Sequence, residues 1–396
     1  MTAAKWSIFV RTGESMTTIY LIRHAEAEGN LFRRAQGHWN GKLTPRGLQQ
    51  ADALAGRFAG VRIDAVYSSD LERARQTAGA ILRGRDLRLN ITRELREINM
   101  GVWEGDSWGN LSYNWPEQMY NFNNDPEKWS VPGCESFEAC RRRMTRAIEG
   151  IASAHDGGTV AIVAHGMCIK IFLMGVMGID PGDPEAMMHG DNTSVSLLHY
   201  GGGRFEVEYY NDNSHLGELS TFARQQWWRD TKKDDPTSLR FAPLDPRSRH
   251  DADFYISCYR DSWVVAHGSD AGFMSSVYLS SARSHAAKDP ATLLKVLSGG
   301  TPAGVLELDP KRGKELNRGW ISLVYLLPEF RGHGLGVQLI GAADAYFSGK
   351  KRSAVRLHVA VTNTHAIAFY HRYGFRDLRR EQGVASDQIL MEREIT

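Results

Sequence analysis

The chain has 396 residues, more than one ordinary hydrophobic core accommodates, so two domains, or three, are expected. Its hydrophobic and charged fractions, 42% and 24%, are typical of globular proteins, and a formal net charge of +2 argues against a nucleic-acid or membrane-surface role. Residues 1–225 hold 24 Lys/Arg against 27 Asp/Glu, about −3, whereas residues 226–396 hold 24 against 19, about +5. The positive second half is compatible with an anionic ligand.

The start of the chain lacks the pattern of a signal peptide, and no apolar run approaches the ~18 residues that a membrane-spanning helix needs. A cytoplasmic location is therefore expected. Because Met16 directly precedes the first predicted strand, residues 1–16 are predicted to be an N-terminal extension outside the fold. The four cysteines have no metal-ligand spacing and are expected to be reduced thiols, and no metal site is predicted. They are Cys134, Cys140, Cys168 and Cys258.

Residues 17–225 alternate strand and helix signals and form the first predicted domain. Continuous apolar runs predict the strands of a buried, mostly parallel central sheet: 17–24, 63–70 and 159–166. Amphipathic patterns predict helices at 43–60, with Thr44 as its cap and Pro45 in its first turn, and at 71–84. A strand pair joined by three glycines is predicted at 194–200 and 204–210. This alternation indicates an α/β fold, an α/β/α sandwich.

The character of the sequence changes around 226–250, a charged stretch with three prolines and no sustained period, which is predicted to be a linker. The second predicted domain covers 251–396 and begins with a helix at 252–268. After a stretch without a clear period come strands at 302–309 and 319–327, a glycine-rich turn, a helix, a strand at 354–361 and a last helix. No internal repeat is visible.

Two arginines and two histidines stand at or just after the ends of predicted strands of the first domain. Arg23 and His24 end the first strand, His165 ends another, and Arg73 lies in the first turn of the helix after a third. Loops after the carboxyl ends of parallel strands meet at one edge of a sheet, so these four side chains are expected to converge. One arginine can donate hydrogen bonds to two oxygens of a phosphate group, and the start of a helix adds backbone N–H donors. The pattern predicts a phosphate site.

Six motifs in fixed order extend this pattern: LIRHAEAEGN (21–30), QGHWNGKLTPRGLQQA (36–51), SSDLERARQTA (68–78), LREINMGVWEG (95–105), PGCES (132–136) and VAHG (163–166). Together they resemble the histidine phosphatase superfamily, the fold of phosphoglycerate mutases and acid phosphatases, over roughly residues 17–220. The resemblance implies that His24 is the nucleophile that takes the phosphoryl group. It also implies that Arg23, Arg73 and His165 hold the phosphoryl oxygens during transfer.

The same resemblance assigns the remaining phosphatase positions. Glu97 matches the proton donor to the leaving oxygen, and Glu94 and Glu104 are neighbouring alternatives. No metal is required. Three further positions match residues near the phosphate: Asn30, Gln36 and Gly37.

Two departures bear on the branch of the family. Ala25 and Ala27 stand where the family commonly has Gly and Thr, and RHAEA also recurs in the branch that acts on phosphohistidine proteins. The stretch at 106–136 instead resembles the small-molecule phosphatases and is expected to form part of a lid whose Trp and Tyr residues pack the lid itself. Hydrolysis of a small phosphorylated metabolite is favoured, and a mutase-type phosphotransferase and a protein phosphohistidine phosphatase stay as alternatives.

A second glycine-rich site is predicted after the strand at 319–327, where residues 331–336 read R-x-x-G-x-G before a helix. Downstream, VAVTNTHAIAFYHRYGF (359–375) combines a strand, an Asn and a helix that ends in Gly-Phe. Together the two motifs resemble the GNAT acetyltransferase superfamily over roughly residues 240–396. The resemblance implies an α/β acetyltransferase fold with a mixed sheet and acetyl-CoA as cosubstrate.

Roles in this second site follow from the resemblance. Asn363 would contact the cofactor, and Tyr370 would protonate the departing thiolate, with an aromatic packed on the sheet as the less favoured alternative for Tyr370. Glu307 and Glu329 are candidates for the base that deprotonates the acceptor amine. Backbone amides would cradle the pyrophosphate at Arg331, Gly332, His333, Gly334, Leu335 and Gly336. The strand edge that pairs with the pantetheine arm would be Tyr325, Leu326 and Leu327.

The hypothesis for the whole chain is a bifunctional enzyme that removes phosphate from a small metabolite and transfers acetyl from acetyl-CoA to an amine acceptor. The rival hypothesis is that the second domain senses acyl-CoA and regulates the phosphatase. No nucleic acid or membrane partner is expected, and an edge strand of the phosphatase domain could pair across a homodimer.

Overall fold

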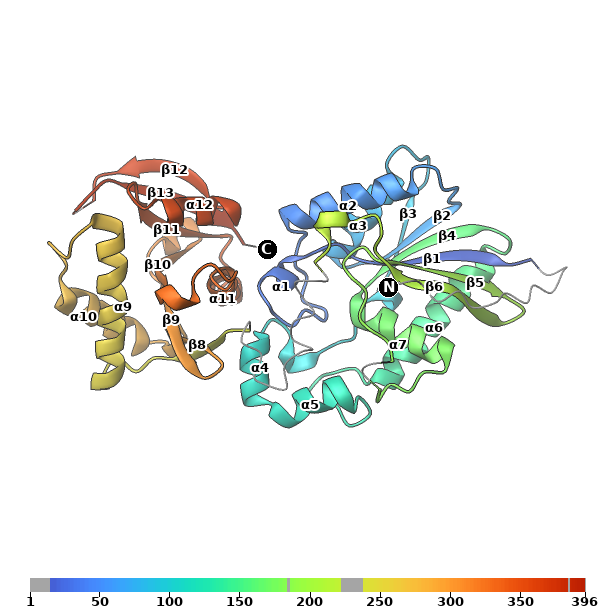
Figure 1. Ribbon diagram of the computed structural model, residues 1–396, viewed down its shortest axis with the longest axis horizontal. Helices are drawn as coiled ribbons and strands as arrows, with labels where there is room; N and C mark the ends of the chain where they lie inside the picture. The colour runs from blue at the N-terminus through green and yellow to red at the C-terminus, as the bar shows by residue number, and fades with distance from the viewer. Residues whose placement is uncertain (1–14, 184–185, 222–237, 384, 396) are drawn as a thin grey trace. The chain divides into compact units, whose positions relative to one another are not determined.

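The structure is a computed structural model that describes residues 15–183, 186–221, 238–383 and 385–395 (Figure 1). The chain forms two compact units. One comprises Met1–Asp106 and Asn114–Lys232, and the other comprises Ser107–Tyr113 and Lys233–Thr396. Each unit has its own sheet and its own helices, which confirms the mixed α/β fold class.

The sheet of the first unit has six strands in the order β3-β2-β4-β1-β5-β6. β1 runs parallel to β4, and β2 runs parallel to both β4 and β3, whereas β5 is antiparallel to β1 and β6. The sheet is therefore mostly parallel, as predicted. The strands are β1 (Thr17–Arg23), β2 (Ala65–Ser69), β3 (Leu89–Thr92), β4 (Thr159–Ala164), β5 (Val195–Gly201) and β6 (Arg204–Asp212).

Helices cover both faces of this sheet. α2 and α3 pack their apolar side chains against one face, and α6 and α7 pack against each other and against the opposite face (Figure 1). Thr44 caps α2 by accepting a hydrogen bond from the N–H of Gly47 (3.0 Å), as its position in the sequence predicts. The helices of this half of the chain are α1 (Glu28–Leu31), α2 (Pro45–Phe58), α3 (Glu72–Leu82), α4 (Trp108–Asn114), α5 (Pro116–Asn124), α6 (Phe137–Ala154) and α7 (Gly166–Met177).

The sheet of the second unit is mixed and has seven strands in the order β12-β13-β11-β10-β9-β8-β7. Only the β10–β11 pair is parallel. The strands are β7 (Arg240–Pro243), β8 (Leu293–Ser298), β9 (Thr301–Asp309), β10 (Arg318–Leu326), β11 (Ala354–Ala360), β12 (Arg376–Glu381) and β13 (Gln388–Glu394). The helices are α9 (Arg249–His267), α10 (Ser275–Ala286), α11 (Val337–Gly349) and α12 (Thr364–Arg372).

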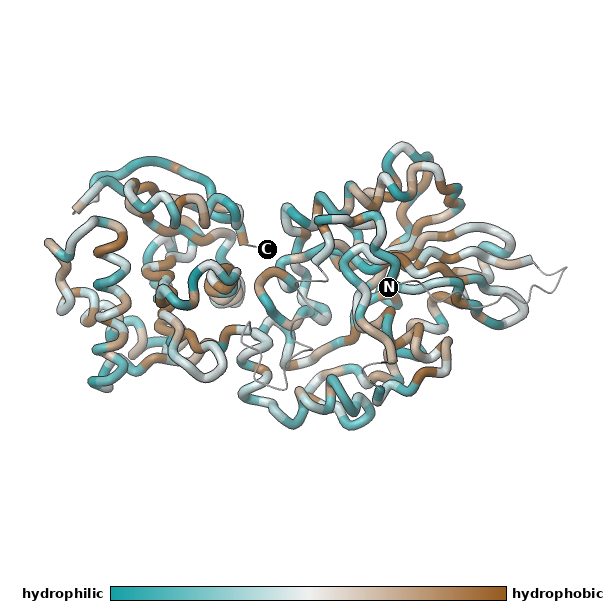
Figure 2. Tube along the Cα trace, viewed as in Figure 1, coloured by the Kyte–Doolittle hydropathy of each residue, from teal (hydrophilic) through white to brown (hydrophobic). Residues whose placement is uncertain are grey.

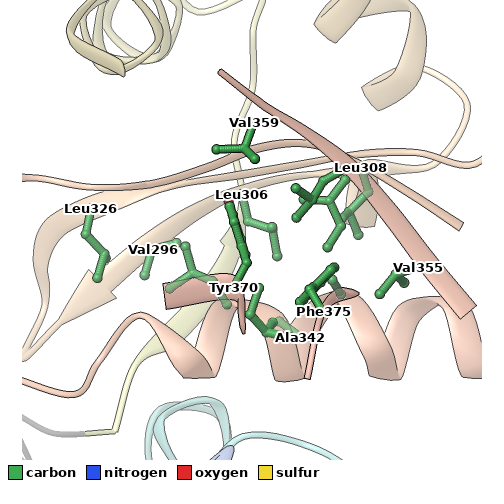
Figure 3. Close-up of a cluster of buried hydrophobic side chains, with 14 of the residues drawn as sticks. Val296, Leu306, Leu308, Leu326, Ala342, Val355, Val359, Tyr370 and Phe375 are labelled. Carbon is green, nitrogen blue, oxygen red and sulfur yellow. The ribbon is translucent and has the colours of Figure 1, made fainter. Parts of the chain in front are cut away.

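Two apolar clusters lie on opposite faces of this second sheet. One joins the sheet to α11 and α12 and includes Leu306, Ala342 and Tyr370 (Figure 3). The other joins the sheet to α9 and α10 and includes Tyr255, Leu323 and others. The alternation of side chains along β9 and β10 therefore divides these strands between two cores.

The segment expected to be a linker, 226–250, is partly structured where the structure describes it. Arg240–Pro243 forms β7, an edge strand antiparallel to β8, and α9 begins at Arg249. A four-residue edge strand ending in proline is too short to give a periodic signal. Residues 226–237 and the N-terminal extension up to residue 14 lie outside the described residues.

The aromatic residues of the stretch predicted to form a lid, 106–136, are divided between buried and exposed positions: Trp129 is buried, whereas Tyr113 and Tyr120 are 66% and 64% exposed. Trp129 of the lid packs edge-on against Trp103 (ring centroids 5.6 Å) and Phe122 (5.1 Å), which supports lid packing for this residue. All four cysteines are free thiols. In Figure 2 apolar residues lie along the strands and on helix segments, yet none of the helices in the described ranges is long and apolar enough to cross a membrane.

Truncation of Phe347 tests the second core. This fully buried ring on α11 lies against Gly319 of β10, so Phe347→Ala leaves a cavity that the sheet cannot fill. We expect the free energy of unfolding of the second unit to fall by about 3–5 kcal/mol in urea denaturation. The exposed Leu316→Ala should change it by less than about 0.5 kcal/mol. Equal losses in the two variants would contradict this core.

Candidate active sites

His24 follows β1 at the centre of the first sheet, with only 2% of its surface exposed. Its Nδ1 lies 2.7 Å from the carbonyl oxygen of Ala25, so Nδ1 must carry the proton and donate it. The other ring nitrogen, Nε2, is then the one with a free lone pair. Burial, together with the charges of Arg73 and Arg23, holds the pKa of His24 well below its usual range. His24 is therefore a neutral imidazole with Nε2 available as a nucleophile.

His165 follows β4, the parallel neighbour of β1, and its ring centroid lies 5.2 Å from that of His24. Its Nδ1 accepts a hydrogen bond from Nε of Arg73 (3.1 Å). Burial, Arg73 and His24 together hold the pKa of His165 well below its usual range, so the proton of the neutral ring lies on Nε2. This Nε2 is buried and has no hydrogen-bond partner in the described part of the chain. His165 thus presents a donor next to the acceptor-type nitrogen of His24.

Arg73 in the first turn of α3 is fully buried and organises the loop that follows α1. Its Nη1 donates to the carbonyl of Trp39 (2.7 Å) and its Nη2 to the carbonyl of Gly37 (2.8 Å). Burial lowers the pKa of Arg73 to about 10, which still leaves it charged at neutral pH. A fixed positive charge is therefore built into this pocket.

Arg23 ends β1 and supplies the second positive charge. Its Nη1 donates to the carbonyl of Gly190 (2.6 Å), while its buried Nε has no partner within the described ranges. A Cβ at Gly166, the first residue of α7, would lie 3.0 Å from this Nε, so glycine leaves room for the guanidinium. The structure thus brings Arg23, Arg73 and both histidines together, as the strand-end argument predicts.

The side chain of Glu97, a residue that precedes α7 by far in the sequence, lies at the N-terminal end of α7, beside the segment that carries His165. One carboxylate oxygen accepts the N–H groups of Cys168 (2.7 Å) and Ile98 (3.0 Å), and the other accepts the N–H of Met167 (3.0 Å). These contacts hold the carboxylate at the N-terminus of α7, where backbone N–H groups are free to bind an anion.

The two alternatives to Glu97 have other surroundings. Glu94 is exposed. Glu104 accepts the N–H groups of His38 (2.8 Å) and Met100 (3.1 Å) through one oxygen, so it braces the loop. Of the three, Glu97 is the one whose carboxylate binds the first turn of α7, next to His165.

The three remaining phosphate-site candidates line the same loop. Asn30 accepts the N–H of Ala27 through Oδ1 (3.0 Å) and so closes the turn around α1. The Gln36 side chain packs on Gly29, and its buried Oε1 has no partner in the part of the chain that is described. Gly37 contributes the carbonyl that holds Arg73.

The second site is organised around an opening in the second sheet. β10 pairs with β11 only from Arg318 to Trp320, so beyond Trp320 its edge toward β11 has no ladder partner among the described strands. On the other side, β10 stays paired with β9 as far as Leu326, and the N–H of Leu327 bonds the carbonyl of Ala303 (2.8 Å). The free edge includes the positions predicted for the pantetheine arm, Tyr325 to Leu327.

The glycine-rich loop connects this strand to α11. Gly332 and Gly334 have φ angles of +81° and +74°, and residues 331–334 are exposed. Arg331 folds back through Nε to the carbonyl of Leu326 (2.8 Å), whereas Leu335 is buried in the core. His333 and Gly336 complete the exposed turn and the helix start. The loop presents backbone groups at the start of a 13-residue helix, which fits an anionic cofactor group.

The downstream candidates lie on and before α12. Asn363 is the N-cap of α12, and its Oδ1 accepts the N–H of Ala366 (3.1 Å). Tyr370 is 9% exposed and lies in the cluster of Figure 3, with its ring centroid 5.3 Å from that of Phe375. Burial raises the pKa of the Tyr370 hydroxyl, which therefore keeps its proton at neutral pH.

The two base candidates of this site differ in their surroundings. Glu329 is exposed in the short turn at Pro328–Phe330. Glu307 on β9 is 2% exposed and accepts a hydrogen bond from the hydroxyl of Tyr255 (2.8 Å). Its other oxygen lies 3.4 Å from Nδ1 of His285 on α10. Of these two candidates, only Glu307 lies inside a polar cluster.

Residues 19–213 match the family model of the histidine phosphatase superfamily (branch 1). Phosphoserine phosphatase 1 of Hydrogenobacter thermophilus is 30% identical over 205 residues, which cover 52% of this chain and 96% of the relative. The chain belongs to the histidine phosphatase superfamily. The probable phosphoglycerate mutase GpmB of Escherichia coli is 32% identical over 209 residues, covering 51% of this chain and 95% of the relative.

Among solved structures, Bacillus stearothermophilus YhfR is 32% identical, with a TM-score of 0.49, and covers 50% of this chain and 98% of its own. The second half of this histidine phosphatase matches a different family model, the acetyltransferase (GNAT) family, at residues 253–375. One chain thus carries a histidine phosphatase domain and a GNAT domain, both of them domains of enzyme families.

Sequence reasoning missed a polar loop that holds the residue after β1, His24, in the phosphatase domain. The Asn192 side chain and the Thr193 N–H both donate to the carbonyl of His24, at 3.0 and 3.3 Å. Asp191, also buried, accepts the hydroxyls of Ser220 and Thr221, each at 2.6 Å. The available signal was the polar run at 191–194 directly before the apolar β5.

A second missed feature is the clamp that Arg143 forms on the Glu97 loop. The guanidinium binds both oxygens of Glu135 (2.8 and 2.7 Å) and donates to the carbonyls of Glu94 (2.7 Å) and Arg96 (3.0 Å). Glu135 belongs to the PGCES motif, so this ion pair gives that motif a structural role beside the candidate acid.

The two neutral histidines predict a pH-dependent stability. Their pKa values are lowered on folding, so the unfolded chain binds protons that the folded chain rejects, and stability is lost as pH falls below about 6.5. Each histidine adds a slope of up to ~1.4 kcal/mol per pH unit. Urea denaturation at pH 7 and pH 5.5 should show a smaller loss for His24→Asn than for wild type. An identical loss would contradict a neutral, buried His24.

Proposed function

We propose that the first domain hydrolyses a small phosphomonoester through a phosphohistidine on His24. The observation that carries this proposal is the opposite protonation of the two facing histidines, with Nε2 of His24 free and Nε2 of His165 protonated. The charges of Arg23 and Arg73 beside them favour a dianionic group, and each lowers the pKa of His24.

In the first step His24 Nε2 attacks phosphorus and the bond from phosphorus to the ester oxygen breaks. Glu97 gives its proton to that oxygen, so an alcohol leaves, while His165 and the two arginines hold the other phosphoryl oxygens. In the second step Glu97 takes a proton from water, which attacks the phosphohistidine and releases inorganic phosphate. His24 returns to its neutral form.

The names of two relatives support a proposal for the substrate class. Phosphoserine phosphatase 1 is named for phosphoserine, and GpmB is named a probable phosphoglycerate mutase. We propose a small phosphorylated metabolite, with phosphoserine as the first ester to test and 3-phosphoglycerate as the test of mutase activity. Hydrolysis is favoured over transfer between two substrate oxygens because the 106–136 stretch resembles the small-molecule phosphatases.

For the GNAT domain we propose acetyl transfer from acetyl-CoA to an amine acceptor. Two features support the position of the cosubstrate: the edge of β10 beyond Trp320, which has no ladder partner among the described strands, and the loop at 331–336, whose residues 331–334 are exposed. Asn363 caps α12 through Oδ1, and its amide nitrogen is proposed to contact the cofactor. An acyl-CoA sensor without transfer is the second candidate, since the same loop would bind it.

We propose Glu307 as the base and Tyr370 as the acid of this transfer. Glu307 pairs with Leu323 on β10, at the irregularity between Ile321 and Leu323 and three residues beyond Trp320, the last residue of β10 that pairs with β11. It takes the proton of the acceptor ammonium, and the neutral amine then attacks the thioester. As the bond from carbon to sulfur breaks, Tyr370, protonated at neutral pH, supplies a proton to the departing sulfur, and the nitrogen of the new amide gives up its extra proton, which restores the Tyr370 hydroxyl. A cytoplasmic location is proposed for both reactions, and the four free thiols support it.

The phosphatase proposal is tested by single substitutions. His24→Ala should reduce hydrolysis of phosphoserine and p-nitrophenyl phosphate by at least ~10³-fold, because no nucleophile remains. Glu97→Gln should reduce phosphoserine hydrolysis by about 10²-fold but affect p-nitrophenyl phosphate less, since nitrophenolate leaves without a proton. A wild-type rate in His24→Ala would rule out the proposed nucleophile.

The acetyltransferase proposal is tested by thiol release from acetyl-CoA with a panel of primary amines. Tyr370→Phe should lower kcat by about 10-fold or more with KM for acetyl-CoA unchanged. Glu307→Gln should remove the rising acid limb of the pH profile of kcat/KM. Tight acetyl-CoA binding without transfer to any amine would favour the sensor instead.

The same assay decides whether the domains are coupled. Phosphatase rates measured with and without acetyl-CoA should be equal if the two enzymes are independent. A change in the phosphatase rate at saturating acetyl-CoA would contradict independence and support regulation.

A further inference from the structure

Arg312 places a positive charge beside the point where β10 and β11 separate. The acetyl transfer itself does not require this charge. It lies in the turn between β9 and β10, and its guanidinium sits over the ring of Trp320, 3.4 Å from the ring centroid. Its Nη2 also approaches Nδ1 of His358 at 3.4 Å. Trp320 is the last residue of β10 that pairs with β11, so Arg312 stands at the level where the sheet opens.

The guanidinium is held by aromatic rings rather than by a carboxylate. Within the described residues no carboxylate lies at ion-pair distance from it. Asp309 uses an oxygen on the N–H groups of Lys311 and Arg312 (2.8 and 3.1 Å), and Glu381 contacts His358 at 3.0 Å. Burial lowers the pKa of Arg312, and Asp309 and Glu381 offset part of that effect. A guanidinium stacked on indole keeps N–H groups directed outward for an anion.

Arg312 also lies near the proposed base. Glu307 is two residues before Asp309 on β9 and so projects from the same face of the sheet as Asp309. Burial raises the pKa of the Tyr259 hydroxyl. The Glu307 carboxylate raises this pKa further, and the Arg312 guanidinium lowers it. Both charges therefore act on one phenol of α9. Trp320 pairs with Asp309 in the β9–β10 ladder, so Glu307 and the guanidinium stacked on Trp320 lie on the same face of the sheet.

We infer that the acceptor is a primary amine that also carries an anionic group, with its ammonium on Glu307 and its carboxylate or phosphonate on Arg312. The inference rests on the proposed acetyl transfer. A bidentate, charge-assisted hydrogen bond between Arg312 and the carboxylate selects amino acids over simple amines, because an analogue without the anionic group leaves the guanidinium unpaired.

The test uses matched acceptors that differ only in the anionic group. Thiol release from acetyl-CoA is measured with L-amino acids, with their carboxamides and decarboxylated amines, and with aminoalkylphosphonates. The variants are Arg312→Gln, Arg312→Lys and the control Arg249→Gln, whose side chain is 97% exposed at the start of α9. Unchanged thermal unfolding and CoA binding establish that each variant is folded.

Wild type should use an acid at least ~10-fold better in kcat/KM than its carboxamide. Arg312→Gln should lower kcat/KM for the acid by about 10- to 100-fold and leave the carboxamide unchanged, with Arg312→Lys between the two. The carboxylate and phosphonate arms identify which anion is preferred. Arg249→Gln should match wild type throughout.

Equal use of acids, carboxamides and amines by wild type and Arg312→Gln would overturn the inference while acetyl transfer stands. If no amine is acetylated, the proposed function fails, and calorimetric binding of the amino acids to the CoA-loaded protein decides the subsite. Binding that Arg312→Gln abolishes would support it, and absence of binding would overturn it.

Discussion

The guanidinium of Arg73 is a positive charge placed inside the phosphatase domain, and its surroundings have to compensate for that charge. The carbonyls of Gly37 and Trp39 and the ring of His165 take its hydrogen bonds. Charge-assisted hydrogen bonds in a buried environment are stronger than neutral ones. The same three contacts order the loop after α1 that contains Gly37 and Trp39, and they set which nitrogen of His165 carries the proton.

The protonation state of His24 follows from the same charges. Two guanidinium groups and burial disfavour an imidazolium, so the ring stays neutral, and the carbonyl of Ala25 fixes its proton on Nδ1. A second layer then holds the main chain, because Asn192 and Thr193 donate to the carbonyl of His24. His24, the proposed nucleophile, is thus oriented through its backbone and its ring together, which leaves Nε2 free to react.

Much of this arrangement was predictable because strand-end positions follow from topology. The convergence of Arg23, His24, Arg73 and His165 needs only a parallel sheet and the order of its strands. The roles of Asn192 and Arg143 were not predictable, since their partners lie 168 residues and up to 49 residues away and no periodic signal marks them.

In the GNAT domain β9, β10 and β11 were visible as apolar runs, whereas β7, with four residues, and α10, with mixed polarity, were not. Burial alone separates Glu307 from Glu329, and burial cannot be obtained from sequence spacing. Arg312 likewise belongs to no motif, and only its stacking on Trp320 gives it significance.

The most direct measurement is the chemical structure of the trapped phosphoenzyme. Rapid acid-free quenching with phosphoserine, followed by mass spectrometry and phosphorus NMR of the His24 peptide, identifies which ring nitrogen carries the phosphoryl group. The hydrogen bond from Nδ1 to Ala25 predicts phosphate on Nε2. Phosphate on Nδ1, or on His165, would contradict the protonation pattern on which the account depends.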